Sequence, residues 1–255
     1  MTQIADLAGL AVTGLWLGVF VFFRVGAAMA VLPAVGEQML SVRVRLVLAL
    51  ILTVAVLPAV ADLLPREEPD VALMLRGVMT ETLNGLVLGL ALRMFVFALQ
   101  TAGSIAAQST SLSQLVGNAG TDPMPALGHI LMTAGLALLM LTGFHVKATA
   151  YLILSYDILP PFSIPDPAAV AEAGREEVTK SFALAFALSA PFVILSVLYN
   201  LTLGFINKAM PQLMVAFVGA PVITFGSVAL LLMTAPLLLT VWLGAVDSFL
   251  SNPFR

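Results

Sequence analysis

Long apolar runs recur along most of this 255-residue chain, and they limit its fold more than any other feature. A helix of about twenty apolar residues is long enough to cross a bilayer, and a soluble domain of this size has no room to bury several such helices. Lipid offers no partners for backbone polar groups, so we interpret the runs as helices. The sequence predicts an all-α integral membrane protein with about six apolar segments, at residues 8–32, 46–61, 71–99, 127–156, 181–206 and 213–246.

The composition excludes several classes of function. Hydrophobic residues make up 60% of the chain and charged residues 10%, whereas soluble domains carry about 25% charged residues. The net charge is -3 and no basic run is present, which excludes nucleic-acid binding. The chain has no cysteine, two histidines (His129 and His145) and no HExxH, phosphate-loop or GxSxG motif. We therefore expect no enzymatic activity, no metal site and no cofactor.

Prolines interrupt three of the apolar blocks. Pro58 lies in the short second block, Pro191 in the fifth, and Pro221 and Pro236 in the overlong sixth. Each proline removes a backbone donor and tends to kink a helix. We therefore expect broken or kinked helical hairpins and reentrant segments rather than six straight crossings.

The charged loops indicate an orientation. Arg43 and Arg45 follow the first block, opposed by Glu37, so the positive-inside rule places this loop in the cytoplasm. The mostly acidic loop at residues 62–70 then falls outside. If successive loops lie on alternating sides of the membrane, Lys208 also lies on the cytoplasmic side. The result is six membrane crossings with both termini outside the cytoplasm.

A polar stripe runs along the third apolar block. Glu81, Gly85, Gly89 and Arg93 follow one another at intervals of four, with Asn84 beside them, so they share one helix face. Glycines at this spacing let two helix backbones approach closely. Twelve residues of helix span about 18 Å, too far for the two charges to pair with each other. Their partners must lie on other helices or in other chains.

Two interpretations of this stripe remain open. Buried charges at membrane depth cost at least about 2.5–3.5 kcal/mol, and they commonly serve function. Glu81 and Arg93 would be relay residues in a proton-coupled small-molecule transporter, or contacts in an assembly. Arg24, late in the first block, fits the assembly interpretation, or it extends to a membrane interface.

An uncharged segment follows the third block. Residues 102–120 carry no charge, many small residues and two glutamines, Gln108 and Gln114. Such a composition suits a segment that packs against protein or lines a pore, but an ordinary flexible loop fits it equally.

Four stretches together resemble the FliR family of flagellar export-gate proteins. They are FFRVGAAMAVLPAVGEQMLSVRVRLVLALILTVAVLP, ETLNGLVLGLALRMFVFALQTAGSIAAQ, TDPMPALGHILMTAGLALLMLTGFHVKATAYLILSYDILPP and NLTLGFINKAMPQLMVAFVGAPVITFG. The resemblance covers nearly the whole chain in order and spacing. Lys208 stands where the family commonly has Arg, which keeps the charge and loses a planar, bidentate donor.

The resemblance implies a subunit of the flagellar type III export gate. Such a subunit assembles with FliP-like and FliQ-like subunits into a helical pore complex, joined by FlhB-like and FlhA-like proteins, in the bacterial cytoplasmic membrane at the flagellar basal body. Unfolded flagellar proteins pass through that pore. A virulence-type secretion subunit is the related alternative. Residues 1–175 would form a FliP-like part that includes a plug loop at 102–120, and residues 176–255 a FliQ-like hairpin.

The resemblance also implies roles for particular residues. The NKAMPQ turn would join the two hairpin helices, with Pro211 at a turn or first helical position. The candidates for the pore plug are Gln108, Gln114, Gly117 and Asn118. The candidates for assembly contacts are Arg24, Glu81, Gly85, Gly89, Arg93, Asn200, Lys208, Pro211 and Gln212.

Overall fold

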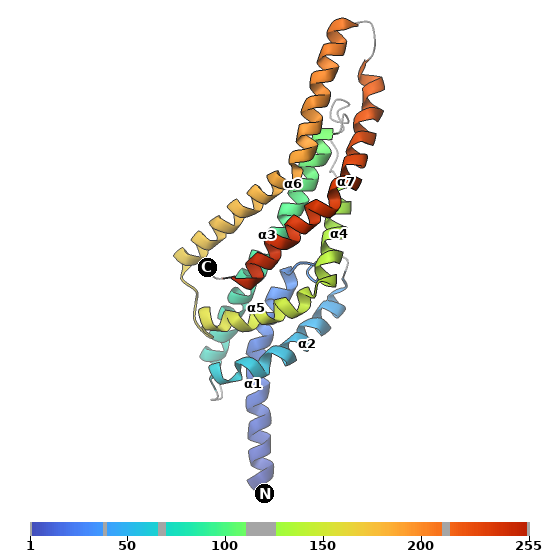
Figure 1. Cartoon of the computed structure of the whole chain (residues 1–255). Coiled ribbons are helices and arrows are strands. Elements are labelled where there is room, and N and C mark those ends of the chain that lie inside the picture. The colour runs from blue at the N-terminus through green and yellow to red at the C-terminus, as the bar shows by residue number, and fades with distance from the viewer. Residues whose placement is uncertain (1, 38–39, 66–69, 111–125, 211–214, 254–255) are drawn as a thin grey trace. The chain divides into compact units, whose positions relative to one another are not determined.

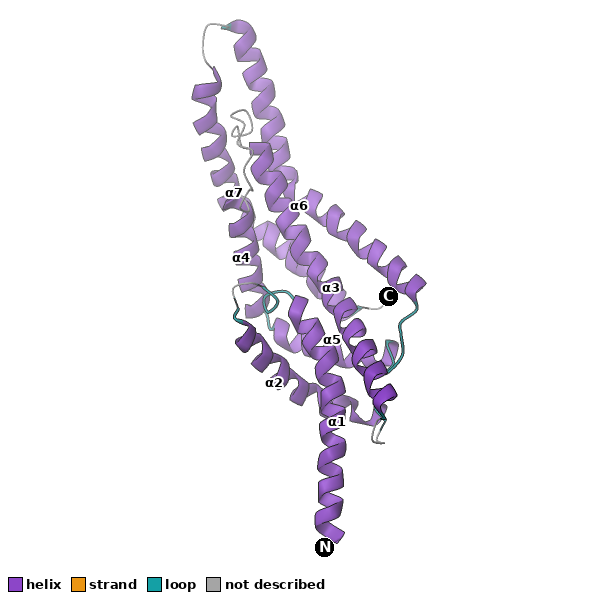
Figure 2. Ribbon diagram, turned by 180° about the vertical axis from the view of Figure 1, so that it is seen from behind, coloured by secondary structure: helices purple, strands orange, loops and turns teal. Residues whose placement is uncertain are grey.

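A computed structural model describes residues 2–37, 40–65, 70–110, 126–210 and 215–253. Within these ranges the chain forms helices and loops with no strand (Figure 2). The elements, coloured along the chain in Figure 1, are α1 (Thr2–Val31), α2 (Val42–Val60), the short η1 (Ala61–Leu63), α3 (Val71–Thr110), α4 (Ala126–Leu141), α5 (Phe144–Ile158), α6 (Pro167–Ala209) and α7 (Val215–Ser251).

The helices match the predicted membrane segments. In the part of the chain that the structure describes, five helices are long and apolar enough to cross a membrane, and a sixth span results if the bent pair α4 and α5 is taken as one. α4 and α5 meet at an angle of 74° across a short break. The prediction of an all-α integral membrane protein with about six apolar segments is confirmed.

The internal prolines do not end the helices in which they lie. α2, α6 and α7 continue through their internal prolines, which are Pro58, Pro191, Pro221 and Pro236. One proline removes one backbone hydrogen bond, and a long apolar helix in a packed bundle tolerates that loss. The sharp break comes instead at Gly143, whose φ of 80° lies in the left-handed region that glycine adopts without strain.

Short polar side chains define where three helices begin. The Ser41 hydroxyl accepts from the Val44 backbone N–H before α2, at 3.4 Å. The Asp70 carboxylate accepts from the Leu73 N–H at 2.7 Å before α3. Asp166 caps α6 in the same way, and Pro167 takes the first helical position, where its missing donor costs little.

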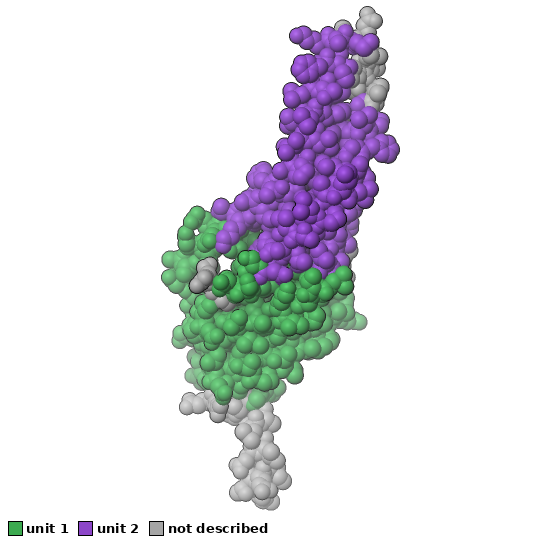
Figure 3. All heavy atoms as spheres, in the orientation of Figure 1, with its two compact units in different colours: residues 1–94, 139–177, 248–255 green, residues 95–138, 178–247 purple. Residues whose placement is uncertain are grey.

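The structure divides into two compact units, which Figure 3 colours separately. Unit 1 consists of residues 1–94, 139–177 and 248–255, and unit 2 of residues 95–138 and 178–247. Val25 of α1, Val56 of α2 and Leu152 of α5 are completely buried in unit 1. Phe192 and Trp242 are completely buried in unit 2.

These units are not the two parts predicted from the family resemblance. The predicted boundary between residues 175 and 176 falls inside α6, which is helical throughout. Unit 2 also includes the end of α3 and most of α4, which belong to the predicted FliP-like part. The division by likeness to sister subunits stays a prediction.

Candidate functional site

Arg24 on α1 and Glu81 on α3 form a fully buried ion pair in unit 1. Arg24 Nε donates to Glu81 Oε2 at 2.7 Å and Arg24 Nη2 to Glu81 Oε1 at 3.2 Å, so the two planar groups meet side by side. Both side chains are 0% exposed. Removing one ion from water costs several kcal/mol, and only a close partner repays this cost. The partner expected for Glu81 on another helix or chain is therefore found on another helix of the same chain.

Helix α5 and the turn after it complete the hydrogen bonds of this pair. Arg24 donates to the Ser155 hydroxyl at 3.3 Å and to the Leu159 carbonyl at 2.9 Å. Glu81 Oε1 accepts from the Phe162 backbone N–H at 3.1 Å. Phe162 has a φ of 59°, which bulky residues rarely adopt. The ion pair thus stabilises a strained turn between α5 and α6.

Two more polar side chains surround the pair. Tyr156 places its ring 3.7 Å from the Arg24 guanidinium carbon, a cation–π contact. Asn84 is completely buried and donates to the Ser163 carbonyl at 3.5 Å. Side chains from three helices of unit 1 (α1, α3 and α5) therefore meet at this one ion pair. We call the following residues the buried polar cluster: Arg24, Glu81, Asn84, Ser155 and Tyr156.

Glycines on α3 bring its backbone against α1, as the stripe predicts. A Cβ at Gly85 would collide with the Arg24 carbonyl oxygen. A Cβ at Gly89 would lie 2.7 Å from the Ala28 carbonyl oxygen and closer still to the Val31 side chain. This close approach lets Glu81, one turn before Gly85, reach the Arg24 side chain.

A second ion pair joins α3 to the α1–α2 connection. Arg93 Nη1 donates to Glu37 Oε1 at 2.6 Å, with side chains 18% and 10% exposed. Arg45 donates to the backbone carbonyls of Glu37 at 2.9 Å and Leu40 at 3.4 Å. Glu81 and Arg93 therefore belong to two separate pairs, as their spacing of about 18 Å on the helix requires.

The predicted plug loop begins later than expected. Residues 102–110 are the last turns of α3 rather than a loop, which corrects the predicted boundary. The small residues that suggested a loop serve close packing: a Cβ at Gly103 would collide with the backbone of Gly128 on α4. Gln108 is exposed on α3. The other three candidates lie outside the described residues: Gln114, Gly117 and Asn118.

The hairpin predicted near the carboxyl terminus is present in unit 2. α6 ends at Ala209 and α7 begins at Val215, and the two helices run side by side in Figures 1 and 2. A Cβ at Gly219 of α7 would collide with the Tyr199 hydroxyl of α6. Asn200 and Lys208 are exposed on α6. Pro211 and Gln212 lie outside the described residues.

Several residues at these sites were missed by sequence reasoning. Glu37 was noted only as a loop charge, although it pairs with Arg93. Ser155 and Phe162 lie more than 70 residues from Glu81 in the chain, and no sequence pattern links them to it. Trp242 donates to the Phe95 carbonyl at 2.8 Å within unit 2. A tryptophan N–H in an apolar helix was the one available signal, because a buried indole needs an acceptor.

Comparison with known proteins identifies the family. The profile described as Bacterial export proteins, family 1, matches residues 15–249. The chain belongs to this family. The chain is 31% identical to the flagellar biosynthetic protein FliR of Caulobacter vibrioides, and the alignment covers 89% of this chain and 91% of the relative. It is 28% identical to FliR of Escherichia coli, over 88% and 86%, and 30% identical to FliR of Bacillus subtilis, over 79% of each.

The family membership confirms the resemblance found in the four sequence stretches. The family match and the FliR relatives together identify this chain as a subunit of the flagellar type III export apparatus. The apolar helices place it in a membrane.

Proposed function

We propose that this chain contributes helices to the export channel through which unfolded flagellar proteins cross the cytoplasmic membrane at the flagellar basal body. The observation that carries the proposal is the extent of the match. Residues 15–249 fit the export family, and 91% of the Caulobacter vibrioides FliR aligns with this chain. A function of the whole relative therefore applies to the whole chain. In this function the chain has no enzymatic role.

The surface of the α6–α7 hairpin supports a role in an assembly. Phe186 and Phe205 on α6 are 61% and 74% exposed, and Phe225 and Met233 on α7 are 77% and 81% exposed. Aromatic residues and methionine are enriched in protein–protein interfaces. We propose that FliP-like and FliQ-like subunits cover this hairpin, and that FlhB-like and FlhA-like proteins join the complex.

The alternative of a proton-coupled transporter required Glu81 and Arg93 to act in one relay. Each residue instead forms its own ion pair in unit 1, Glu81 with Arg24 and Arg93 with Glu37. Both Glu81 oxygens already accept hydrogen bonds from Arg24. We therefore assign the two pairs to holding the helices of this subunit together, which supports assembly indirectly.

Purification from membranes in a mild detergent tests the proposal. We expect the tagged chain to retain FliP-like and FliQ-like subunits, identified by mass spectrometry of the co-purifying chains. The matched control is an unrelated polytopic protein with the same tag, expressed in the same cells. Recovery of the chain alone from cells that assemble flagella would contradict the proposal, as would solute uptake driven by a proton gradient in liposomes that contain this chain alone.

A further inference from the structure

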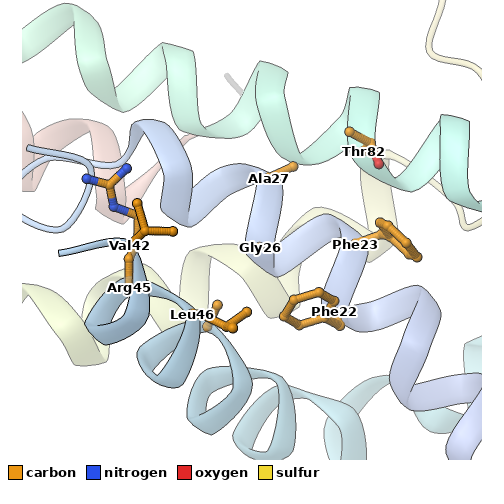
Figure 4. Close-up of a pocket in the computed structure, with 9 residues that line it drawn as sticks. Phe22, Phe23, Gly26, Ala27, Val42, Arg45, Leu46 and Thr82 are labelled. Atoms are coloured by element: carbon orange, nitrogen blue, oxygen red, sulfur yellow. The ribbon is translucent and has the colours of Figure 1, made fainter.

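A groove opens between α1, α2 and α3 on the surface of unit 1 (Figure 4). Its volume is about 330 Å³, near the lower end of the roughly 300–1,000 Å³ typical of small-molecule sites. Phe22 and Phe23 of α1 form one end, and Gly26 leaves the middle open because it has no side chain. Leu46 of α2 lies along the groove. An elongated apolar group fits this lining.

The other end of the groove carries a positive charge. Arg45 lines this end, opposite the two phenylalanines in Figure 4. Its Nε has no hydrogen-bond partner, and its Nη2 donates only to the carbonyls of Glu37 and Leu40. The Glu37 carboxylate is paired with Arg93 instead. Among the described residues, no acid neutralises Arg45.

Arg45 lies at one end of a candidate membrane span. The candidate span begins at Val42, so Arg45 lies in its first turn. A first turn sits at the level of the lipid headgroups, and each later turn lies about 5.4 Å deeper. Ala49, one turn after Arg45, also lines the groove. The groove therefore runs from headgroup level toward the hydrocarbon core.

Exposed apolar side chains lie along α2, both at the groove and farther along the helix. Val42 and Leu46 are 77% and 50% exposed, and Ile51 and Val54 farther along α2 are 59% and 71% exposed. The exposed surface of α2, at Val42 and Leu46 beside the groove and at Ile51 and Val54 on other sides of the helix, is as apolar as a surface that contacts lipid tails. An acyl chain in the groove would be continuous with the surrounding bilayer.

We propose that the groove is a binding site for an anionic phospholipid, with one acyl chain between Arg45 and the Phe22–Phe23 pair and the phosphate beside Arg45. The phosphate supplies the acceptor and the negative charge that Arg45 lacks. Basic pockets between membrane helices on the cytoplasmic side favour anionic headgroups, and the positive-inside rule places this loop on that side. The inference concerns lipid binding by unit 1 and stands apart from the proposed channel.

Lipid binding to the purified full-length chain tests this site. The chain, purified in detergent, is titrated with dioleoyl phosphatidylglycerol or dioleoyl phosphatidylcholine, and bound lipid is counted by native mass spectrometry. We expect the anionic lipid to bind more tightly. Arg45→Gln should weaken it about fivefold, which corresponds to about 1 kcal/mol. The matched control is Arg43→Gln, because Arg43 is exposed and does not line the groove.

A second pair of variants tests the apolar part while leaving Arg45 in place. Gly26→Leu places a side chain in the groove and should abolish tight binding of the anionic lipid. Gly14→Leu makes the same change on α1 where nothing lies within 4 Å of the new Cβ, and binding should persist. Equal losses for Arg45→Gln and Arg43→Gln, or undiminished binding to Gly26→Leu, would overturn the proposal.

A photo-crosslinker distinguishes lipid from a neighbouring protein chain. p-Benzoylphenylalanine at position 46 lies along the groove, and irradiation of membranes should attach phospholipid to the chain, detected as a mass shift of the tryptic peptide. A crosslink to another protein in place of lipid would assign the groove to a subunit contact and refute the lipid site.

Discussion

Arg24 is a charged residue in an apolar helix, and its surroundings explain how the chain accommodates it. It is completely buried, and its guanidinium donates to a carboxylate, a hydroxyl and a carbonyl. Buried ion pairs add little net stability over apolar residues of similar size, but the loss of one partner is costly. The value of this pair therefore lies in fixing which surfaces of α1, α3 and α5 meet.

Substitution of Glu81 tests this role. Glu81→Leu leaves Arg24 buried without its counter-charge, and we expect the free energy of unfolding in detergent micelles to fall by about 3–5 kcal/mol. The double variant Arg24→Leu with Glu81→Leu should recover most of this loss. The control is Glu172→Gln, which removes an exposed pair with Arg175 and should leave stability unchanged. If Glu81→Leu alone is as stable as wild type, the ion pair does not determine which helix surfaces meet.

The same pair predicts an effect on the turn after α5. Loss of Glu81 also removes the acceptor for the Phe162 N–H, and Phe162 then has less to hold its positive φ. We expect faster hydrogen exchange at residues 159–163 in Glu81→Leu than in wild type, measured by mass spectrometry. Unchanged exchange in this segment would show that the Phe162 ring, which contacts Phe20 at 4.6 Å, is enough to fix the turn.

At the scale of helices, contact between backbones sets the arrangement within each unit. α3 and α1 approach in unit 1 at Gly85 and Gly89, and α3 and α4 approach in unit 2 at Gly103 and Gly128. In membranes the hydrophobic effect does not drive helices together, so close packing at small residues has to supply the attraction. Side chains at these glycines would separate the helices.

Gly85→Ala measures this effect in unit 1. Alanine favours a helix by about 1 kcal/mol over glycine, but its Cβ would collide with the Arg24 carbonyl oxygen and lie 3.0 Å from the Ala27 Cβ. We expect a net loss of about 1–3 kcal/mol in the free energy of unfolding, because overpacking against backbone has no easy relief. Gly14→Ala has open space and should be neutral or stabilising. Equal effects at the two positions would refute the close approach.

Gly103→Ala makes the corresponding test in unit 2. The new Cβ would collide with the Gly128 Cα, a backbone atom that cannot rotate away. We expect a similar loss of about 1–3 kcal/mol, read as a lower midpoint of thermal unfolding. Gly244→Ala on α7, where nothing lies within 4 Å, is the matched control. A midpoint no lower than that of the control would count against the α3–α4 contact.

At the scale of the whole molecule, the chain has the features of a subunit rather than of a self-contained transporter. The Arg24–Glu81 and Arg93–Glu37 pairs lie in unit 1, where they join α3 to α1 and to the α1–α2 connection. Its hairpin of α6 and α7 exposes large apolar and aromatic side chains. These features agree with a member of the bacterial export family that works inside the flagellar export apparatus.

The pore-plug prediction belongs to this scale, because it concerns the assembled gate. The sequence between α3 and α4 is uncharged as far as Gly120, and Gly117 lies near its middle. We expect Gly117→Trp and Gly117→Asp to change flagellar protein secretion or to raise ion leak, measured by export assays and membrane potential. Gly174→Asp, on α6 with open space around it, is the control. Normal secretion and normal leak in both Gly117 variants would reject the plug.

The sequence alone determined the helical membrane class and the α3 stripe, because each depends on residues close together in the chain, and the resemblance of four stretches to the FliR family predicted the hairpin. Length and hydropathy set the spans, and the spacing of four put Gly85 and Gly89 on the face of α3 that meets α1. The same reasoning placed the loop start at residue 102 instead of after Thr110. Local propensity was overridden there by packing against neighbouring helices.

Only the tertiary structure decided which charges pair. The spacing along the helix excluded an ion pair between Glu81 and Arg93. It gave no reason to expect that Glu81 pairs with Arg24 or that Arg93 pairs with Glu37. The same holds for the Phe162 N–H, 81 residues from its acceptor. Partners so distant in sequence are brought together by how the helices pack in three dimensions, and a one-dimensional pattern of hydropathy carries no information on that arrangement.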